Sequence, residues 1–156
     1  MTDEYWMRLA IEKTRQGVLA GQSPFGAVIV RGNDLVVVAH NLVVESTDIT
    51  AHGEVTAIRQ ACAELHAIDL AGCRIYSTCE PCPMCFSACH WANLDQIIYG
   101  ASIADAAATG FREMPISNHE MKRLGHCRLN VTGGLLREES VDLFRLWLQQ
   151  PGRKLY

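Results

Sequence analysis

Two short clusters in the sequence carry side chains that bind metals. His52 and Glu54 lie two residues apart, and segment 81–85 reads Pro-Cys-Pro-Met-Cys, with thiols at Cys82 and Cys85. One imidazole and two thiolates are three ligands for a tetrahedral zinc. A catalytic zinc keeps its fourth position for water, whereas structural sites are usually closed by four protein ligands. The sequence therefore predicts one catalytic Zn²⁺ per chain, held by His52, Cys82 and Cys85.

Glu54 is expected to act beside the metal rather than on it. Cys82 and Cys85 are three residues apart at a predicted helix start, so they lie on one side of its first turn. Glu54 follows His52 by only two residues, so on a helix it points elsewhere. Zinc lowers the pKa of a bound water to about 7. A carboxylate nearby can then carry a proton from that water to the substrate and the leaving group. Glu54 is accordingly predicted to be catalytic.

Two other metal sites compete with this interpretation. The spacing C-x₂-C-x₂-C-x₃-C of bacterial iron–sulfur ferredoxins is shared by Cys79, Cys82, Cys85 and Cys89. However, His90 rather than proline follows the last cysteine, there is no second such run, and His52 and Glu54 are left without a role. The other alternative is a structural zinc module without activity. Glu54 argues against it, because a purely structural site needs no general base.

Composition favours one cytoplasmic domain that acts on a small molecule. The chain has 156 residues, 49% of them apolar, and a net charge of −3. It has no run of Lys or Arg such as nucleic-acid-binding domains show. No apolar run approaches the roughly 18 residues of a membrane span, and the first four residues do not resemble a secretory signal. We expect one zinc-binding domain over residues 1–150, followed by a C-terminal tail over 151–156.

The hydrophobic pattern predicts an α/β sandwich with helices on both faces of the sheet. Helices are expected over Asp3–Ala20, His52–His66, Pro81–Asn93 and Glu138–Gln150. Strands are expected over Ala27–Arg31, Leu35–His40, Cys73–Cys79, Gln96–Gly100 and Arg128–Thr132. Segment 32–34 is a hairpin signal between the first two strands. Segment 100–125 is the least readable and allows only short helical pieces.

The pattern H-x-E followed by P-C-x-x-C is a known signature of zinc-dependent base deaminases. With it, the chain resembles the cytidine deaminase-like superfamily over nearly its whole length, and within it the bacterial guanine deaminases. The similarity is carried by segments 24–30, 50–59, 79–85, 105–111 and 154–156. It implies a three-layer α/β/α sandwich around a five-stranded mixed sheet. It also implies hydrolysis of guanine to xanthine and ammonia.

The same resemblance implies how the base is held. The Asn41 side chain and the Ala51 backbone would hydrogen-bond the purine. Phe25 and Trp91 would flank its ring, and Tyr156 would cap the pocket. The family further implies a homodimer in which the C-terminal segment crosses to close the site of the partner subunit.

Two departures from the family pattern leave the substrate open. Gly53 stands where alanine is common, as it does in fungal cytosine deaminases. Glu113, the acid after the Gly-Phe step that would help the amine leave, is aspartate in some relatives. Either departure fits a shift toward cytosine, guanosine or another amino-heterocycle. A tRNA adenosine deaminase is a further alternative, against which the negative net charge weighs.

Overall fold

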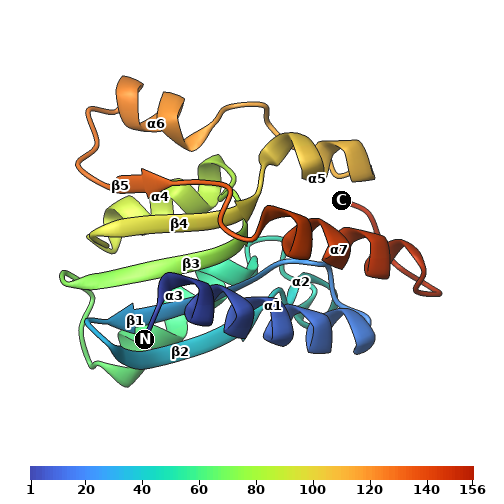
Figure 1. Ribbon diagram of the computed structural model, residues 1–156, viewed down its shortest axis with the longest axis horizontal. Helices are drawn as coiled ribbons and strands as arrows, with labels where there is room; N and C mark the ends of the chain where they lie inside the picture. The colour runs from blue at the N-terminus through green and yellow to red at the C-terminus, as the bar shows by residue number, and fades with distance from the viewer.

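The computed structural model describes residues 1–156, and its centre is a five-stranded sheet in the order β2-β1-β3-β4-β5 (Figure 1). The strands are β1 (Gly26–Arg31), β2 (Asp34–His40), β3 (Cys73–Cys79), β4 (Gln96–Ala101) and β5 (Asn130–Thr132). β1 pairs antiparallel with both β2 and β3, whereas β3, β4 and β5 run parallel. Parallel neighbours need crossover connections, and helices provide them here. The predicted mixed sheet is confirmed.

Helices cover both faces of this sheet. They are α1 (Asp3–Leu19), α2 (Val43–Ser46), α3 (Gly53–Glu64), α4 (Pro83–Trp91), α5 (Ile103–Thr109), α6 (Asn118–Leu124) and α7 (Arg137–Leu148). In Figure 1, α1 and α7 lie in front of the sheet, and α3 and α4 lie behind it. The predicted three-layer sandwich is therefore confirmed. None of these helices combines the length and the apolar character that crossing a membrane requires.

Alternation along the strands divides the core between the two faces, because successive side chains of a strand point to opposite sides. Val28 of β1 packs with Trp6 and Leu143 from α1 and α7, whereas its neighbour Ile29 packs with Ala57 of α3 on the other face. Both faces of β1 are thus buried, which accounts for its unbroken apolar sequence. The core fixes α3 and α4 side by side on one face.

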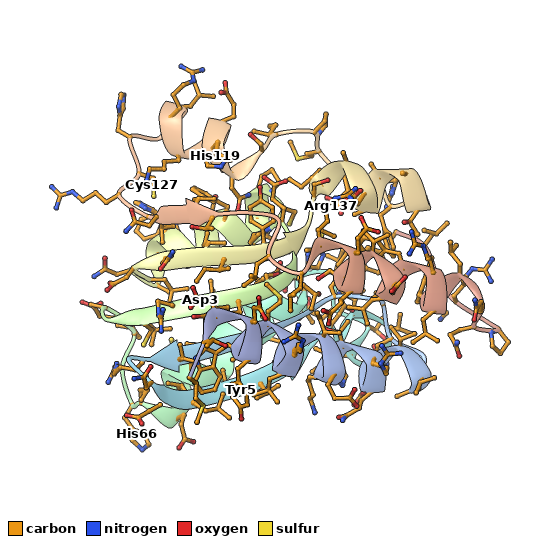
Figure 2. The ribbon with its side chains drawn as sticks, viewed as in Figure 1. Asp3, Tyr5, His66, His119, Cys127 and Arg137 are labelled. Carbon is orange, nitrogen blue, oxygen red and sulfur yellow. The ribbon has the colours of Figure 1, made fainter.

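Segment 100–125 folds into the two short helices α5 and α6, in agreement with the expectation of short helical pieces. α5 begins with a capping box formed by Ser102 and Asp105. Arg137, at the start of α7, points toward α5 (Figure 2), where its Nε and Nη2 donate to Asp105 at 3.1 and 2.5 Å. The four-residue helix α2 was not expected. Its N-cap position, Leu42, offers no capping side chain, so the sequence carries no start signal there.

Candidate metal centre and pocket

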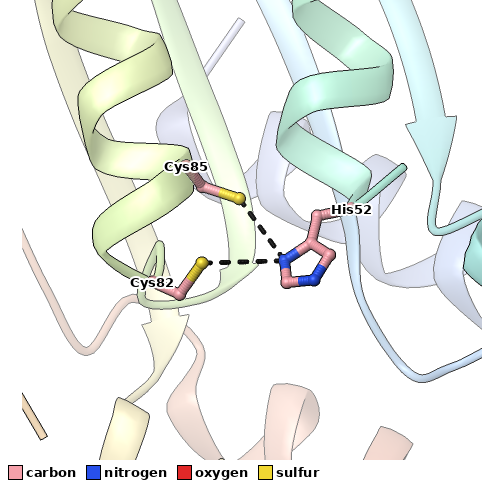
Figure 3. Close-up of side chains that lie close together, drawn as sticks. All are labelled: His52, Cys82 and Cys85. Atoms are coloured by element: carbon pink, nitrogen blue, oxygen red, sulfur yellow. Dashed lines mark hydrogen bonds between the residues drawn. The ribbon is translucent and has the colours of Figure 1, made fainter. Parts of the chain in front are cut away.

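The three predicted zinc ligands meet where the N-termini of α3 and α4 converge (Figure 3). His52 is the N-cap residue of α3, and Cys82 is that of α4, with Cys85 in the first turn. The Nδ1 atom of His52 lies 3.6 Å from the Sγ atom of Cys82 and 3.5 Å from that of Cys85. All three ligand atoms lie within 4.8 Å of one another.

These distances fit a zinc ion. With Zn–S bonds of about 2.3 Å and Zn–N bonds of about 2.0–2.1 Å, a tetrahedral site separates nitrogen from sulfur by about 3.6 Å. No further histidine, cysteine or acid joins the three as a close ligand group. A metal held here would therefore keep one position for a non-protein ligand, as catalytic zinc sites do.

The iron–sulfur alternative finds no support in the placement of the other two cysteines. The Cys79 thiol points to the carbonyl oxygen of Ser102, 3.5 Å away. Cys89 is fully buried in the apolar core, where a thiol behaves as a small hydrophobic group.

The pKa values of the two thiols are shifted in opposite directions. A hydrogen bond from Cys85 and the neighbouring His52 lower the pKa of Cys82 to about 4. The same thiol pair and burial raise the pKa of Cys85 well above its usual value. Burial lowers the pKa of His52, but the Cys82 thiolate and the nearby carboxylates outweigh it, so the net shift is upward. The site thus concentrates negative charge that a cation would neutralise.

Glu54 lies next to these ligands and is 4% exposed. Burial, and then the charge on Cys82, raise the pKa of its carboxyl group, so the site makes Glu54 a stronger proton acceptor than a carboxylate in water. Ser77 Oγ donates to Glu54 Oε1 at 2.9 Å. Sequence reasoning missed Ser77, although a polar residue on the inward-facing row of a buried strand was a usable signal.

Two of the predicted ligands, His52 and Cys82, line two spaces that share part of their walls. An inner cavity of about 20 Å³ is lined by these two ligands together with Phe25, Glu54, Cys79, Glu80, Phe111, Glu113 and Tyr156. An outer groove of about 380 Å³ is lined mainly by apolar side chains, namely Ile49, Pro83, Met84, Met114 and Tyr156, together with His52, Cys82, Arg112 and Glu113. A larger cavity of about 490 Å³ around His90 and His126 contains none of the predicted site residues. Chemistry rather than volume therefore identifies the site.

The C-terminal tail closes this pocket on its own chain. Asn41 is fully buried, and its Nδ2 donates to the Tyr156 hydroxyl at 2.8 Å, while its Oδ1 accepts from Val43 N at 3.0 Å. Arg112 N donates to Tyr156 O at 3.2 Å. The Tyr156 and His52 ring centroids are 5.9 Å apart. Burial raises the pKa of Tyr156 to about 12, so its phenol stays neutral at physiological pH.

The remaining predicted residues divide into those inside and outside the pocket. Phe25 lines the inner cavity, and its ring packs edge-on against Phe111 at 4.9 Å. Ala51 is buried directly before His52 in the chain and lines neither space. Burial, and then the charge on Cys82, raise the pKa of Glu113 to about 7. Trp91 does not join them: it is 84% exposed and lines a separate depression on α4. Phe111, to which sequence reasoning gave no role, is a pocket wall.

Comparison with known proteins agrees with this arrangement. Residues 1–101 match the family model of the cytidine and deoxycytidylate deaminase zinc-binding region. Guanine deaminase of Bacillus subtilis is 46% identical over 157 residues, covering 100% of both chains. A tRNA-specific adenosine deaminase of Bacillus subtilis is 30% identical over 97% of this chain and 92% of its own length. The structure of guanine deaminase from Nitrosomonas europaea superposes with a TM-score of 0.85 at 31% identity, covering 94% of this chain and 84% of that one.

Proposed function

Because the chain belongs to the cytidine and deoxycytidylate deaminase family of zinc-binding proteins, we propose that it hydrolyses guanine to xanthine and ammonia. The observation that carries the proposal is a three-ligand metal site with a buried carboxylate beside it and a small cavity lined by both. The 46% identity to a guanine deaminase along the whole chain supports guanine as the base.

The residues of the site divide the reaction between them. A zinc held by His52, Cys82 and Cys85 would supply an activated water at the cavity. Glu54 would accept one proton from the water and pass it to a ring nitrogen as the water oxygen bonds to C2. It would then pass the second proton of that oxygen to the amine, which leaves C2 as ammonia. The Ser77 hydrogen bond on Oε1 orients Glu54 and leaves Oε2 for this transfer. Glu113, with a pKa near 7, would hold a second exchangeable proton near the leaving amine.

Recognition of the base would come from groups on several elements. The Asn41 amide and the Ala51 backbone would hydrogen-bond the purine edge, and Phe25 would lie against its face. Tyr156 would cap the pocket by holding Asn41 in place. Trp91 lies outside the pocket of its own chain, so it would flank a purine only in a neighbouring subunit of a homodimer.

A substrate screen tests the proposal. Ammonia release is measured with guanine, guanosine, cytosine, cytidine, adenine and ammeline, using zinc-replete protein and Glu54→Gln as the control for contaminating activity. We expect guanine to give the highest kcat/KM. Faster turnover of cytosine would show that Gly53 is the better guide to specificity and would refute the assignment.

Deamination of adenosine in tRNA is the second candidate, because a relative with that activity aligns over 97% of the chain. The outer groove disfavours it, since Arg112 is its sole arginine or lysine and phosphate contacts dominate affinity for nucleic acids. A tRNA anticodon stem-loop added to the screen distinguishes the two. Inosine formation without release of ammonia from guanine would favour the second candidate.

We further propose that the tail of one subunit exchanges with that of a second copy. Pro151 and Gly152, the latter with φ of +68°, form a turn that could open as a hinge. Mixing Glu54→Gln subunits with subunits that lack Leu155 and Tyr156 tests this exchange. A swapped dimer regains activity because the hybrid contains one complete site, whereas a tail that closes its own chain gives no recovery.

A further inference from the structure

A buried carboxylate outside the proton-transfer machinery joins two helix starts. Glu80 follows β3 and is 7% exposed. Its Oε2 accepts from Ile103 N at 3.1 Å, and its Oε1 accepts from Asn118 N at 2.8 Å. These two donors are the first residues of α5 and α6. One side chain therefore fixes the starts of two helices that are separated along the chain.

Each contact satisfies a group that a helix leaves unpaired, because the first N–H groups of a helix have no partner within it. Ser102 and Ser117 already cap the N–H groups of the third residues in α5 and α6. Glu80 adds a bond to the first residue of each helix. A negative charge at a helix N-terminus is also favoured by the helix dipole. Burial and this carboxylate raise the pKa of Tyr99 to about 12.

The segment enclosed by these bonds forms the wall of the pocket. Between α5 and α6, residues 110–117 carry Phe111 and Glu113, which both contact the inner cavity. Arg112, in the same segment, holds the tail through Tyr156 O. The position of this wall relative to the metal therefore sets the shape of the cavity.

Glu80 is also tied to the metal ligands through the chain. It lies two residues before Cys82, and its backbone N–H donates to Ala101 O at 2.8 Å, which fixes it between β3 and β4. Asn118 Nδ2 donates to Pro81 O at 2.6 Å, so α6 contacts the same turn twice. A single turn thus delivers a zinc ligand and anchors the pocket wall.

We propose that Glu80 is a positioning residue that holds segment 110–117 against the zinc-binding turn and thereby governs affinity for the base. The assignment of a substrate affinity to this wall rests on the proposed deaminase function. Glu80 lines the inner cavity together with Glu54 and Glu113. Unlike Glu54, it has both carboxylate oxygens engaged by backbone N–H groups, so we assign it a positioning role.

This role predicts a characteristic kinetic signature for Glu80→Gln. The amide offers one carbonyl oxygen, so at most one of the two helix starts remains anchored. When only a fraction of the molecules has the wall in place, apparent affinity falls by that fraction, and bound ligand restores the ordered state. We expect KM to rise about 10-fold to 100-fold while kcat stays within about threefold. Glu54→Gln should do the opposite and lower kcat.

Three further variants isolate the contact. Asn118→Pro removes the N–H that Glu80 binds. The substitution is compatible with the fold, because proline is tolerated at the first position of a helix and the preceding residue, Ser117, is extended with ψ of 157°. Asn118→Ala keeps that N–H and loses only the side chain, so it should raise KM less than Asn118→Pro. Asp105→Asn weakens the side-chain cap of α5 and the contact with Arg137 but leaves both Glu80 bonds in place, so it should leave KM near wild type. Asn118→Pro also serves if Glu80→Gln fails to fold.

Hydrogen exchange separates this inference from the proposed activity. In Glu80→Gln with full zinc content, amides of 110–118 should exchange faster, while those of 83–91 stay protected. Unchanged exchange at 110–118, or uniform loosening with loss of zinc and of kcat, would overturn the inference. If the wild-type protein does not deaminate guanine, the proposed function is refuted but the role of Glu80 is not. The exchange comparison still decides the role of Glu80, and kinetics then use the best base found in the screen.

Discussion

Removal of Leu155 and Tyr156 should impair catalysis far more than folding. The tail packs on the pocket through two hydrogen bonds, from Asn41 Nδ2 to the Tyr156 hydroxyl and from Arg112 N to Tyr156 O. Its aromatic ring also lies 5.6 Å from that of Phe111. Leu155 is 55% exposed, so the contact with the body of the protein is made mostly by the last residue.

The expected change in stability is small because two terms nearly cancel. The two hydrogen bonds contribute about 0.5–1.5 kcal/mol each, and partial burial of one aromatic ring adds about 1 kcal/mol. Ordering two residues costs about 1–2 kcal/mol each in backbone entropy. The net loss is therefore about 1 kcal/mol or less, which shifts the Tm of a chain of this size by about 2–4 °C.

The expected loss of activity is larger because truncation opens the cavity. Asn41 loses the partner that orients its amide. Water also enters the site and weakens the interactions that stabilise the charge developing during the reaction. If the lost interactions contribute about as much as one hydrogen bond, about 1.4 kcal/mol, affinity falls tenfold. We expect kcat/KM on guanine to fall at least about tenfold.

Calorimetry and steady-state ammonia release on the truncated protein measure both effects. Tyr156→Phe is the matched control: it keeps the ring wall and removes only the hydroxyl that Asn41 binds, so its loss should be smaller. Wild-type kcat/KM after truncation would refute the reasoning and return the tail to the surface. A fall in Tm of more than about 10 °C would show instead that the tail stabilises the fold.

Three further changes test the site. Glu54→Gln should keep zinc and the wild-type Tm but lose at least about 10²-fold in kcat, because an amide cannot accept and return a proton; near-normal turnover would exclude Glu54 as the proton carrier. Cys82→Ser should lose zinc and lower the Tm, since metal binding energy is part of folding energy; metal analysis that finds stoichiometric zinc would contradict the ligand set. Asn41→Ala should lower kcat/KM on guanine by leaving the ring edge unpaired, and unchanged kinetics would remove it from the base-binding set.

The strands and main helices follow from patterns that act locally. Apolar runs bounded by turn residues predicted β1 and β2. The tight turn between them includes Gly32, whose φ of +60° lies in the left-handed region that glycine adopts readily. The predicted helix start at His52 is off by one residue, because His52 is the N-cap and the helix begins at Gly53. The four-residue α2 escaped detection because a helix this short has neither periodicity nor a capping side chain.

The sequence alone identified the residues of the predicted metal centre from their types and spacing, although only the pair Cys82 and Cys85 is local, and His52, 30 residues before Cys82, is brought to it by the packing of α3 and α4. One helical turn brings Cys82 and Cys85 together. His52 is the N-cap residue of the neighbouring helix α3, and its imidazole is a common metal ligand. The residue types also predicted a catalytic role for Glu54, which lies buried at the same cavity as His52 and Cys82.

Only the tertiary structure decided what surrounds that centre. Ser77 and Glu80 gain their roles from partners 23 to 38 residues away, whose positions depend on how the layers pack. The same packing leaves Trp91 outside the pocket of its own chain and brings Tyr156 over it. No local pattern encodes such contacts, because they form only when a shared core has placed segments that are distant in sequence next to one another.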